Sequence, residues 1–191
     1  MLVILSGVSG AGKDTIKELI MQENKNVVSI PSYTTREKRN YEVEGVQYYF
    51  VSNDEFEKLI IENKLYEYSK HHLNYYGTSK HALDKAVKNG NIIIKDVDVN
   101  GTDALKRVLP SNGIKVVSIF LNIDKEEMLK RLENRGDNLS EEIIALRMSR
   151  YEYEISNMKK YDYVIKNLDA IKTKDIILQI IEREQRECLQ K

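Results

Sequence analysis

A glycine-rich loop between an apolar segment and an amphipathic segment constrains the fold of this chain more than any other feature. The apolar segment covers residues 2–5, the loop covers residues 7–12, and Lys13 follows the loop. Residues 14–22 carry their apolar side chains on one stripe, which predicts a helix. Glycines at this spacing let backbone N–H groups converge on phosphate oxygens, and the helix N-terminus and the lysine add positive charge. The sequence therefore predicts a P-loop, a binding site for the phosphates of a nucleoside triphosphate.

One position departs from the usual P-loop pattern. Asp14 stands where a serine or threonine normally contacts Mg2+, and Thr15 follows it. A carboxylate here has three open roles, because it can ligate Mg2+ directly or through water, repel phosphate, or cap the helix. Asp14 and Thr15 are the candidate metal ligands. The predicted ATP phosphate site comprises Gly7, Val8, Ser9, Gly10, Ala11, Gly12, Lys13, Asp14 and Thr15.

Beyond the loop, apolar segments typical of buried strands alternate with helical patterns. The alternation predicts an α/β fold of the P-loop NTPase type, in which helices flank a parallel sheet. Residues 32–79 differ, because they are rich in Tyr, Arg and Glu and contain a single expected helix. The expected strands cover residues 2–5, 27–30, 92–98, 116–121 and 163–165, and the expected helices cover residues 14–22, 54–62, 101–109, 125–133, 140–158 and 170–188.

We expect one domain with three parts. Residues 1–31 and 80–191 form the P-loop core, residues 32–79 form an inserted lobe, and a helical lid covers about residues 125–158. A chain of 191 residues has an ordinary size for a single domain of this kind.

Composition narrows the possible partners and the compartment. The chain has 30 basic and 30 acidic residues, so no net charge draws it to nucleic acid or to a membrane surface. Its single cysteine, Cys188, excludes an internal disulfide and is typical of a reducing compartment. The chain contains no apolar run of about 18 residues that would span a membrane. We expect a cytoplasmic protein with no nucleic-acid or membrane partner.

A second cluster of phosphate-binding groups follows the P-loop. Arg36 and Arg39 lie close together in the sequence, and Tyr48 follows them. Guanidinium groups bind phosphate oxygens bidentately, and phenol hydroxyls add neutral donors that fix the orientation. Two phosphate-binding sites in one small chain indicate that a phosphoryl group moves between them.

The segment around this cluster resembles the guanylate kinase family. Residues 34–51 read Thr-Thr-Arg-x2-Arg-x2-Glu-x2-Gly-x2-Tyr-x-Phe-Val, which matches the family signature. Residues 66–68, 74–78 and 96–101 give further matches, and the resemblance covers nearly the whole chain. It implies ATP-dependent phosphorylation of GMP, and of dGMP, to the diphosphate in purine nucleotide metabolism. ATP is then the co-substrate and Mg2+ the cofactor.

The resemblance also implies the residues that bind GMP. Two arginines and two tyrosines would hold the phosphate, while Glu67 would accept hydrogen bonds from the guanine N1–H and its exocyclic amine. Adenine lacks these donors, and polar sites of this kind discriminate by roughly 10⁴-fold or more. Thr78 replaces the usual serine, and Asp98 closes the base pocket at the end of its strand. The implied GMP-binding residues are Ser32, Arg36, Arg39, Tyr48, Glu67, Tyr76, Thr78 and Asp98.

Three arginines match family positions on the lid and its flanking helices. Such arginines compensate the charge that spreads over the transferring phosphoryl group. With the P-loop lysine, the implied catalytic set is Lys13, Arg131, Arg135 and Arg147. Asn167 resembles the residue that meets the adenine end of ATP. Lys95 falls where an apolar residue is expected on a buried strand, and whether it reaches neighbouring acids or bound phosphates stays open.

Two other functions remain as alternatives. Ribose 1,5-bisphosphate phosphokinase is similar around its P-loop and also carries Gly-Lys-Asp there, but a sugar phosphate has no use for Glu67. Guanylate-kinase-like domains of scaffold proteins are non-catalytic modules that bind phosphopeptides. These modules typically have a degraded P-loop, whereas Gly10, Gly12 and Lys13 are present in this chain.

Overall fold

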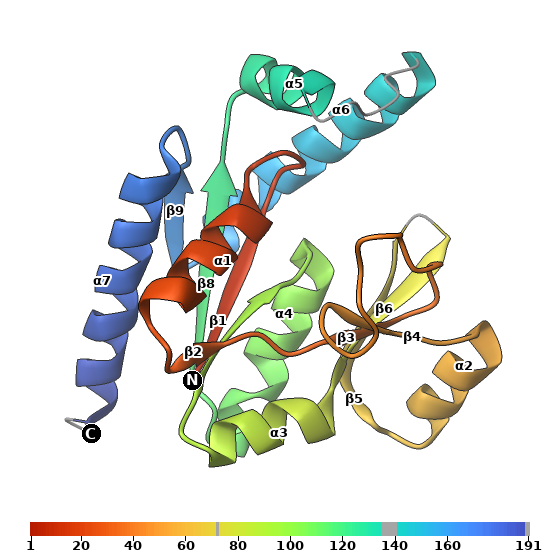
Figure 1. Ribbon diagram of the computed structural model, residues 1–191, viewed down its shortest axis with the longest axis vertical. Helices are drawn as coiled ribbons and strands as arrows, with labels where there is room; N and C mark the ends of the chain where they lie inside the picture. Colours follow the sequence, from red (N-terminus) through yellow and green to blue (C-terminus); the bar gives the residue numbers. More distant parts are fainter. Residues whose placement is uncertain (72, 135–140, 190–191) are drawn as a thin grey trace. The chain divides into compact units, whose positions relative to one another are not determined.

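A computed structural model describes residues 1–71, 73–134 and 141–189 of the chain (Figure 1). Its central sheet has the strand order β2-β7-β1-β8-β9. The pairs β2–β7 and β8–β9 are parallel, which confirms the expected α/β fold. The strands of this sheet are β1 (Leu2–Gly7), β2 (Val27–Val28), β7 (Ile92–Asp96), β8 (Val116–Asn122) and β9 (Tyr163–Lys166).

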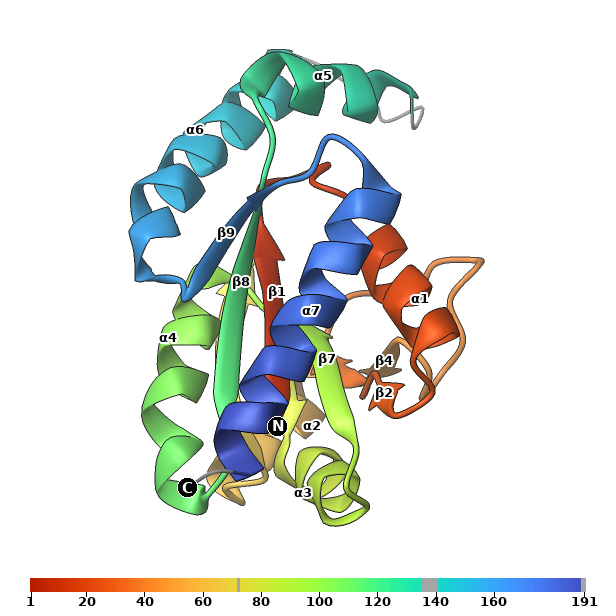
Figure 2. The same cartoon turned by 90° about the vertical axis from the view of Figure 1, so that its left-hand side faces the viewer.

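The chain forms two compact units, and the second comprises Val3–Asn24, Asp96–Val99 and Val117–Lys191. Within it, α1 (Lys13–Glu23) and α7 (Ala170–Leu189) lie side by side (Figure 1, Figure 2). Each helix buries a pair of isoleucines one turn apart, because side chains four positions apart share a helix face. The pair in α1 is Ile16 and Ile20, and the pair in α7 is Ile177 and Ile181; all four are fully buried.

The same unit contains the two helices that fall in the range expected for the lid. These are α5 (Lys125–Asn134) and α6 (Glu141–Asn157), and a short 3-10 turn, η2 (Met158–Lys160), leads from α6 toward β9. Met128 and Leu132 of α5 are fully buried, so one face of this helix packs against the rest of the unit. Both views show α5 and α6 beyond the same end of β8 (Figure 1, Figure 2).

The first unit comprises Met1–Leu2, Lys25–Lys95 and Asn100–Val116. It contains a second sheet with the order β4-β3-β6-β5, all of it within residues 32–79. The strands are β3 (Ser32–Thr34), β4 (Tyr48–Phe50), β5 (Leu65–His71) and β6 (Asn74–Ser79). The helices of this unit are α2 (Asn53–Ile61), α3 (Lys80–Lys88), the greater part of α4 (Val99–Val108), and the 3-10 turn η1 (Pro110–Asn112).

A capping box fixes the start of α2. The Ser52 hydroxyl accepts from the Glu55 N–H, and the Glu55 carboxylate accepts from the Ser52 N–H. Phe56, in the first turn, is fully buried and stacks on Tyr75 of β6 with ring centroids 5.2 Å apart. The cap and the stack together hold the helix against the second sheet.

Three details differ from the sequence prediction. β2 ends at Val28 rather than at residue 30, and β7 ends at Asp96 because α4 begins at Val99. The helix α3 was not expected; its N-cap is the Ser79 hydroxyl, which accepts from the Ala82 N–H. Among the described residues, no helix is long and apolar enough to cross a membrane.

Candidate active site

Close packing at the base of the P-loop requires glycine. Gly7 has φ +141, and a Cβ at this position would lie 2.1 Å from the Leu121 carbonyl oxygen on β8. Gly12 has φ +83, and its Cβ would lie 2.8 Å from the Asn167 Nδ2. The Ala11 N–H donates to the Val8 carbonyl inside the loop at 3.1 Å. Glycine therefore lets the loop lie directly against β8 and the end of β9.

The P-loop lysine bends back over its own loop. Lys13 Nζ donates to the Gly7 carbonyl at 2.8 Å and to the Val8 carbonyl at 3.3 Å. These contacts hold the ammonium within the second unit at the loop whose N–H groups are expected to receive phosphate oxygens. The placement supports the predicted role of Lys13.

Arg131 on α5 is anchored at the P-loop. Its guanidinium donates to the Gly10 carbonyl at 3.3 Å and to the Asn167 carbonyl at 2.9 Å. The Nε group donates to the Glu127 carboxylate, one turn earlier, at 2.7 Å. The described structure therefore holds Arg131 at the P-loop, and its catalytic role stays a prediction.

A second lid arginine reaches the same loop from α6. Arg147 Nη1 donates to the Ser9 hydroxyl at 2.9 Å. Arg135, the third arginine of the predicted set, lies outside the described residues. Two of the three expected cations are thus placed at the P-loop by hydrogen bonds.

Asn167 is tied to the loop rather than exposed beside it. Its side chain is 3% exposed, and Nδ2 donates to the Ala11 carbonyl at 2.7 Å. Its Oδ1 is buried and has no hydrogen-bond partner among the described residues. The amide group therefore braces the P-loop through its nitrogen, while its role at the adenine end of ATP stays a prediction.

The candidate metal ligands lie on the first turn of α1. Asp14 and Thr15 are both exposed, and Asp14 accepts a hydrogen bond from Lys17 at 3.3 Å. Lys17 also lies 3.5 Å from Asp96 Oδ2, at the end of β7. Asp96 Oδ1 is buried and has no hydrogen-bond partner in the described part of the chain. The same part contains no group of three or more His, Cys, Asp or Glu side chains placed to hold a metal ion.

The two aspartates titrate as a pair. Burial raises the pKa of Asp96 above its ordinary value of 3.8; Lys17 opposes this, and the Asp14 carboxylate reinforces it. Desolvation by the surrounding protein also tends to raise the pKa of Asp14. The positive charge of Lys17 and a hydrogen bond with Asp96 outweigh this effect, so the pKa of Asp14 is lowered. Two neighbouring carboxylates repel each other, and a cation bound between them relieves the repulsion. The chemistry of the pair therefore fits a hydrated Mg2+, which prefers oxygen ligands.

Glu42 organises the two arginines of the first unit that are predicted to bind phosphate. This carboxylate is buried and accepts from Arg36 Nη1 at 3.0 Å and from Arg36 Nη2 at 2.6 Å. It also accepts from the Arg39 backbone N–H at 2.8 Å. Glu42 belongs to the family signature, but it was not among the predicted site residues.

Paired charges set the protonation of this group. Hydrogen bonding to Glu42 raises the pKa of Arg36 against the effect of burial, and a hydrogen bond with Tyr76 adds to it. Burial opposes ionisation of Glu42, but Arg36 and the Arg39 N–H outweigh it and hold its pKa below 4.5. Both groups are therefore charged at neutral pH.

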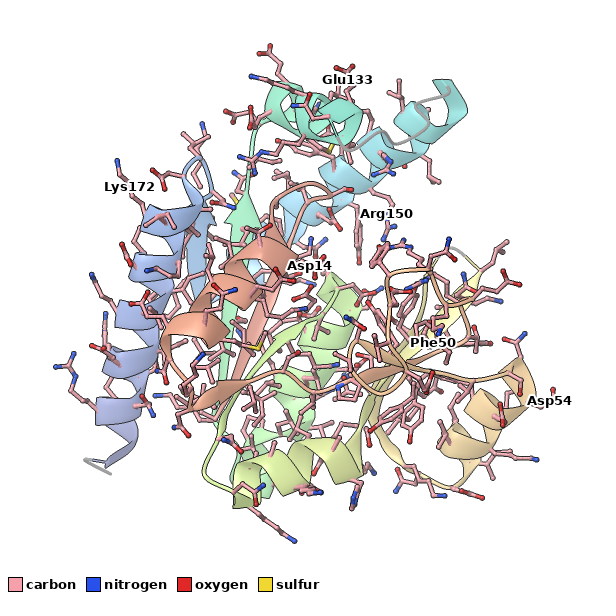
Figure 3. The ribbon with its side chains drawn as sticks, in the orientation of Figure 1. Asp14, Phe50, Asp54, Glu133, Arg150 and Lys172 are labelled. Atoms are coloured by element: carbon pink, nitrogen blue, oxygen red, sulfur yellow. The ribbon has the colours of Figure 1, made fainter. Side chains whose placement is uncertain are left out.

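Aromatic rings surround the Arg36 guanidinium. Its carbon lies 5.3 Å from the ring centroid of Tyr48 and 5.7 Å from that of Phe50, which Figure 3 labels on the second sheet. The rings of Tyr48 and Tyr76 have centroids 6.0 Å apart. Arg36, Tyr48 and Tyr76 thus form one cluster, whereas the Arg39 guanidinium donates to the Tyr41 hydroxyl at 2.7 Å on an exposed segment.

Three predicted base-binding residues form a row across the second sheet. The strand register places Ser32 of β3 opposite Thr78 of β6, and Thr78 opposite Glu67 of β5. Directly opposed residues of antiparallel strands point to the same face. The buried Thr78 hydroxyl donates to Glu67 Oε1 at 2.5 Å, and Lys95 Nζ donates to the Ser32 hydroxyl.

Asp98 belongs to the second unit, two positions beyond β7. The charge of Asp98 acts on Glu154 of α6, a residue that the sequence prediction did not include. Burial raises the pKa of Glu154, the cations Lys13 and Arg150 oppose this, and Asp98 reinforces it. Figure 3 labels Arg150, whose side chain projects from α6. Arg147, Arg150 and Glu154 are three and four positions apart, so helical spacing alone would have placed them on one face of α6.

Comparison with known proteins agrees with this arrangement. A family model described as guanylate kinase matches residues 1–184. A Helicobacter pylori guanylate kinase is 40% identical over 180 residues, covering 94% of this chain and 85% of that protein. One from Rickettsia felis is 38% identical over 186 residues, covering 97% and 94%. The crystal structure of guanylate kinase from Anaplasma phagocytophilum superposes with a TM-score of 0.76 and 30% identity, covering 97% of this chain and 86% of that one. The chain belongs to the guanylate kinase family.

Proposed function

We propose that this protein transfers the γ-phosphoryl group of ATP to GMP, yielding ADP and GDP, and that it also accepts dGMP. The observation that carries the proposal is that the buried Thr78 holds the buried Glu67, in a row that continues to the half-buried Ser32. A buried carboxylate is costly unless donors meet it, and the guanine N1–H and amine supply such donors. AMP would leave Glu67 short of hydrogen bonds.

The acceptor phosphate would bind at the Arg36, Tyr48 and Tyr76 cluster. Arg36 donates two N–H groups to Glu42 and one to the Glu37 carbonyl at 2.6 Å, and a guanidinium has five in total. The Glu42 carboxylate therefore orients Arg36 while leaving the group able to donate to phosphate oxygens. Arg39 would supply a second guanidinium from the exposed segment.

On the ATP side, Lys13, Arg131 and Arg147 would compensate the charge that spreads over the transferring group. Arg135 and the buried amide oxygen of Asn167 complete the proposed site. Mg2+ would be held by Asp14 together with Asp96, with Thr15 beside them, and would neutralise phosphate charge. The acceptor is already an oxyanion, so the chain needs no general base.

The inserted lobe and the helical lid would have separate roles in this reaction. Residues 32–79 would act as the GMP-binding lobe, and about residues 125–158 would act as the lid on a core of residues 1–31 and 80–191. Closing over ATP would exclude water from the phosphates. We also place the activity in the cytoplasm, where both nucleotides occur and where a single unpaired cysteine stays reduced.

A steady-state assay with four acceptors tests the function. Purified protein with ATP and Mg2+ is given GMP, dGMP, AMP or ribose 1,5-bisphosphate, and ADP release is followed. We expect turnover with GMP and dGMP and at least roughly 10⁴-fold lower kcat/KM with AMP. Turnover of the sugar phosphate without GMP turnover would replace the assignment, and GMP binding without ATP binding would indicate a non-catalytic module.

A further inference from the structure

A lysine is buried near the end of β7 in the first unit. Ile92, Ile93 and Ile94 of β7 are at most 2% exposed, and Lys95 directly after them is 3% exposed. Fully buried lysines are rare, because removing an ammonium from water is costly unless acceptors surround it. A strand of this kind normally continues with an apolar residue. The ammonium at this position therefore depends on hydrogen-bond acceptors within the fold.

One acceptor of the Lys95 ammonium is a hydroxyl on the second sheet. Lys95 Nζ donates to the Ser32 hydroxyl, and Ser32 stands opposite Thr78 in the strand register. Thr78 in turn holds Glu67. The row thus presents positive and hydroxyl donors at the Ser32 end and a carboxylate acceptor at the Glu67 end.

This order of polarity matches one edge of guanine. The edge presents the 6-oxo oxygen, an acceptor, followed by the N1–H and the 2-amino group, which are donors. Adenine presents the reverse order at the first two positions, an amino donor followed by an N1 acceptor. With the two donors of guanine on Glu67, the 6-oxo oxygen falls at the Ser32 end.

We propose that Lys95 determines specificity for 6-oxo purines, with its ammonium and the Ser32 hydroxyl as the donors to the 6-oxo oxygen. The inference rests on the proposed GMP-binding function. A charge-assisted hydrogen bond would favour the keto oxygen, and the same ammonium would oppose the amino group of adenine, donor against donor. The pocket would then reject AMP from both ends of the row.

The test compares Lys95→Met with wild type on two acceptors. Methionine keeps the length of the side chain and removes its donors. GMP carries the 6-oxo oxygen, whereas 2-aminopurine riboside monophosphate carries hydrogen there and, as a consequence, has no N1–H. Wild-type turnover of the two acceptors therefore differs at Glu67 as well, so the quantity compared is the ratio of variant to wild-type kcat/KM for each acceptor. For GMP we expect kcat/KM to fall by about 10- to 100-fold, the effect of losing a hydrogen bond from a charged group. For the 2-aminopurine nucleotide we expect it to stay within about twofold, because no oxygen is present to lose a donor.

Controls separate this role from a structural one. Lys88→Met, at an exposed position of α3, should leave both acceptors unchanged. Lys95→Arg retains a cationic donor and should keep more of the GMP preference than the methionine variant. If circular dichroism shows that Lys95→Met does not fold, Lys95→Gln replaces it, and its neutral donor should give an intermediate ratio of the two kcat/KM values.

The outcomes are distinct. An equal loss for both acceptors in a folded variant would overturn the role of Lys95 in recognising the 6-oxo group. So would an unchanged ratio in Lys95→Gln. Wild-type protein that turns over neither acceptor would instead refute the proposed function itself. A selective loss with GMP supports the inference.

Discussion

Replacing Glu42 with glutamine tests how the phosphate-binding arginines are held in place. Glu42 is 6% exposed, and its two oxygens accept two N–H groups of Arg36 and one of Arg39. Breaking one partner out of a buried ion pair costs about 3–5 kcal/mol. Glutamine keeps one oxygen acceptor, and the Arg36 side chain is 17% exposed, so we expect a loss of about 2–3 kcal/mol in the free energy of unfolding.

The same substitution should weaken GMP binding selectively. Arg36 would lose its orienting partner, and KM for GMP should rise about tenfold or more, while KM for ATP stays within about twofold. Urea unfolding followed by circular dichroism measures the stability, and the coupled kinase assay measures both KM values. Glu44→Gln is the matched control, because Glu44 lies on the same segment, is exposed, and accepts only long contacts of 3.3 Å from the Phe50 N–H in that segment.

The pH dependence follows from the depressed pKa of Glu42. Its contribution to stability is fully present above the ordinary value of 4.5 and is lost as the pH falls through the lower value of the folded protein. The difference between Glu42→Gln and wild type should therefore be constant between about pH 6 and 8 and shrink in acid. Equal stability and equal KM values in the two proteins, or the same losses in Glu44→Gln, would refute this reasoning.

Three further substitutions probe the rest of the site. Glu67→Gln should lower kcat/KM for GMP by about 2–3 kcal/mol of transition-state stabilisation and leave ATP binding intact, as calorimetry would show; an unchanged kcat/KM would exclude a role in guanine recognition. Asp14→Ser should raise the Mg2+ concentration at half-maximal activity, and a titration superimposable on wild type would leave Asp14 as a helix cap only. Gly7→Ala should cost more than about 3 kcal/mol in urea unfolding, because its Cβ would meet the Leu121 carbonyl at 2.1 Å. The control Gly113→Ala, with positive φ but open space around it, should cost only about 1 kcal/mol.

The inner strands of the central sheet, β1, β7 and β8, were predictable because they are almost wholly buried and contain continuous apolar runs. The expected strand at residues 116–121 corresponds to β8 (Val116–Asn122), and the expected helix at residues 170–188 to α7 (Ala170–Leu189). The helix α3 was missed although the sequence carried two signals for it. Its buried Leu83 and Ala86 lie three positions apart on one helix face, and Ser79 is a favourable N-cap.

The candidate site was predictable as a set of residues but not as an arrangement. The pairing of Ser32 with Thr78 depends on strand register across a long stretch of sequence, which propensity and motif spacing do not determine. Glu42 was visible in the signature, yet its support of Arg36 and Arg39 depends on the turn that brings its carboxylate back to these two residues. The contact that Lys95 makes stayed open for a similar reason. Alternation along a strand does not identify the residue that faces the lysine from another part of the chain, here Ser32.

The close approach of Gly7 to β8 has a consequence for how the protein meets its nucleotide. Glycine-rich segments are the most flexible parts of an unfolded chain, and immobilising them is entropically unfavourable. Here that ordering is completed during folding, because the Leu121 backbone and the Asn167 side chain already confine the loop. An incoming triphosphate would therefore find a cradle of fixed shape, and its affinity would not be reduced by the need to organise the backbone. High backbone NMR order parameters for the loop in the nucleotide-free protein would show this rigidity.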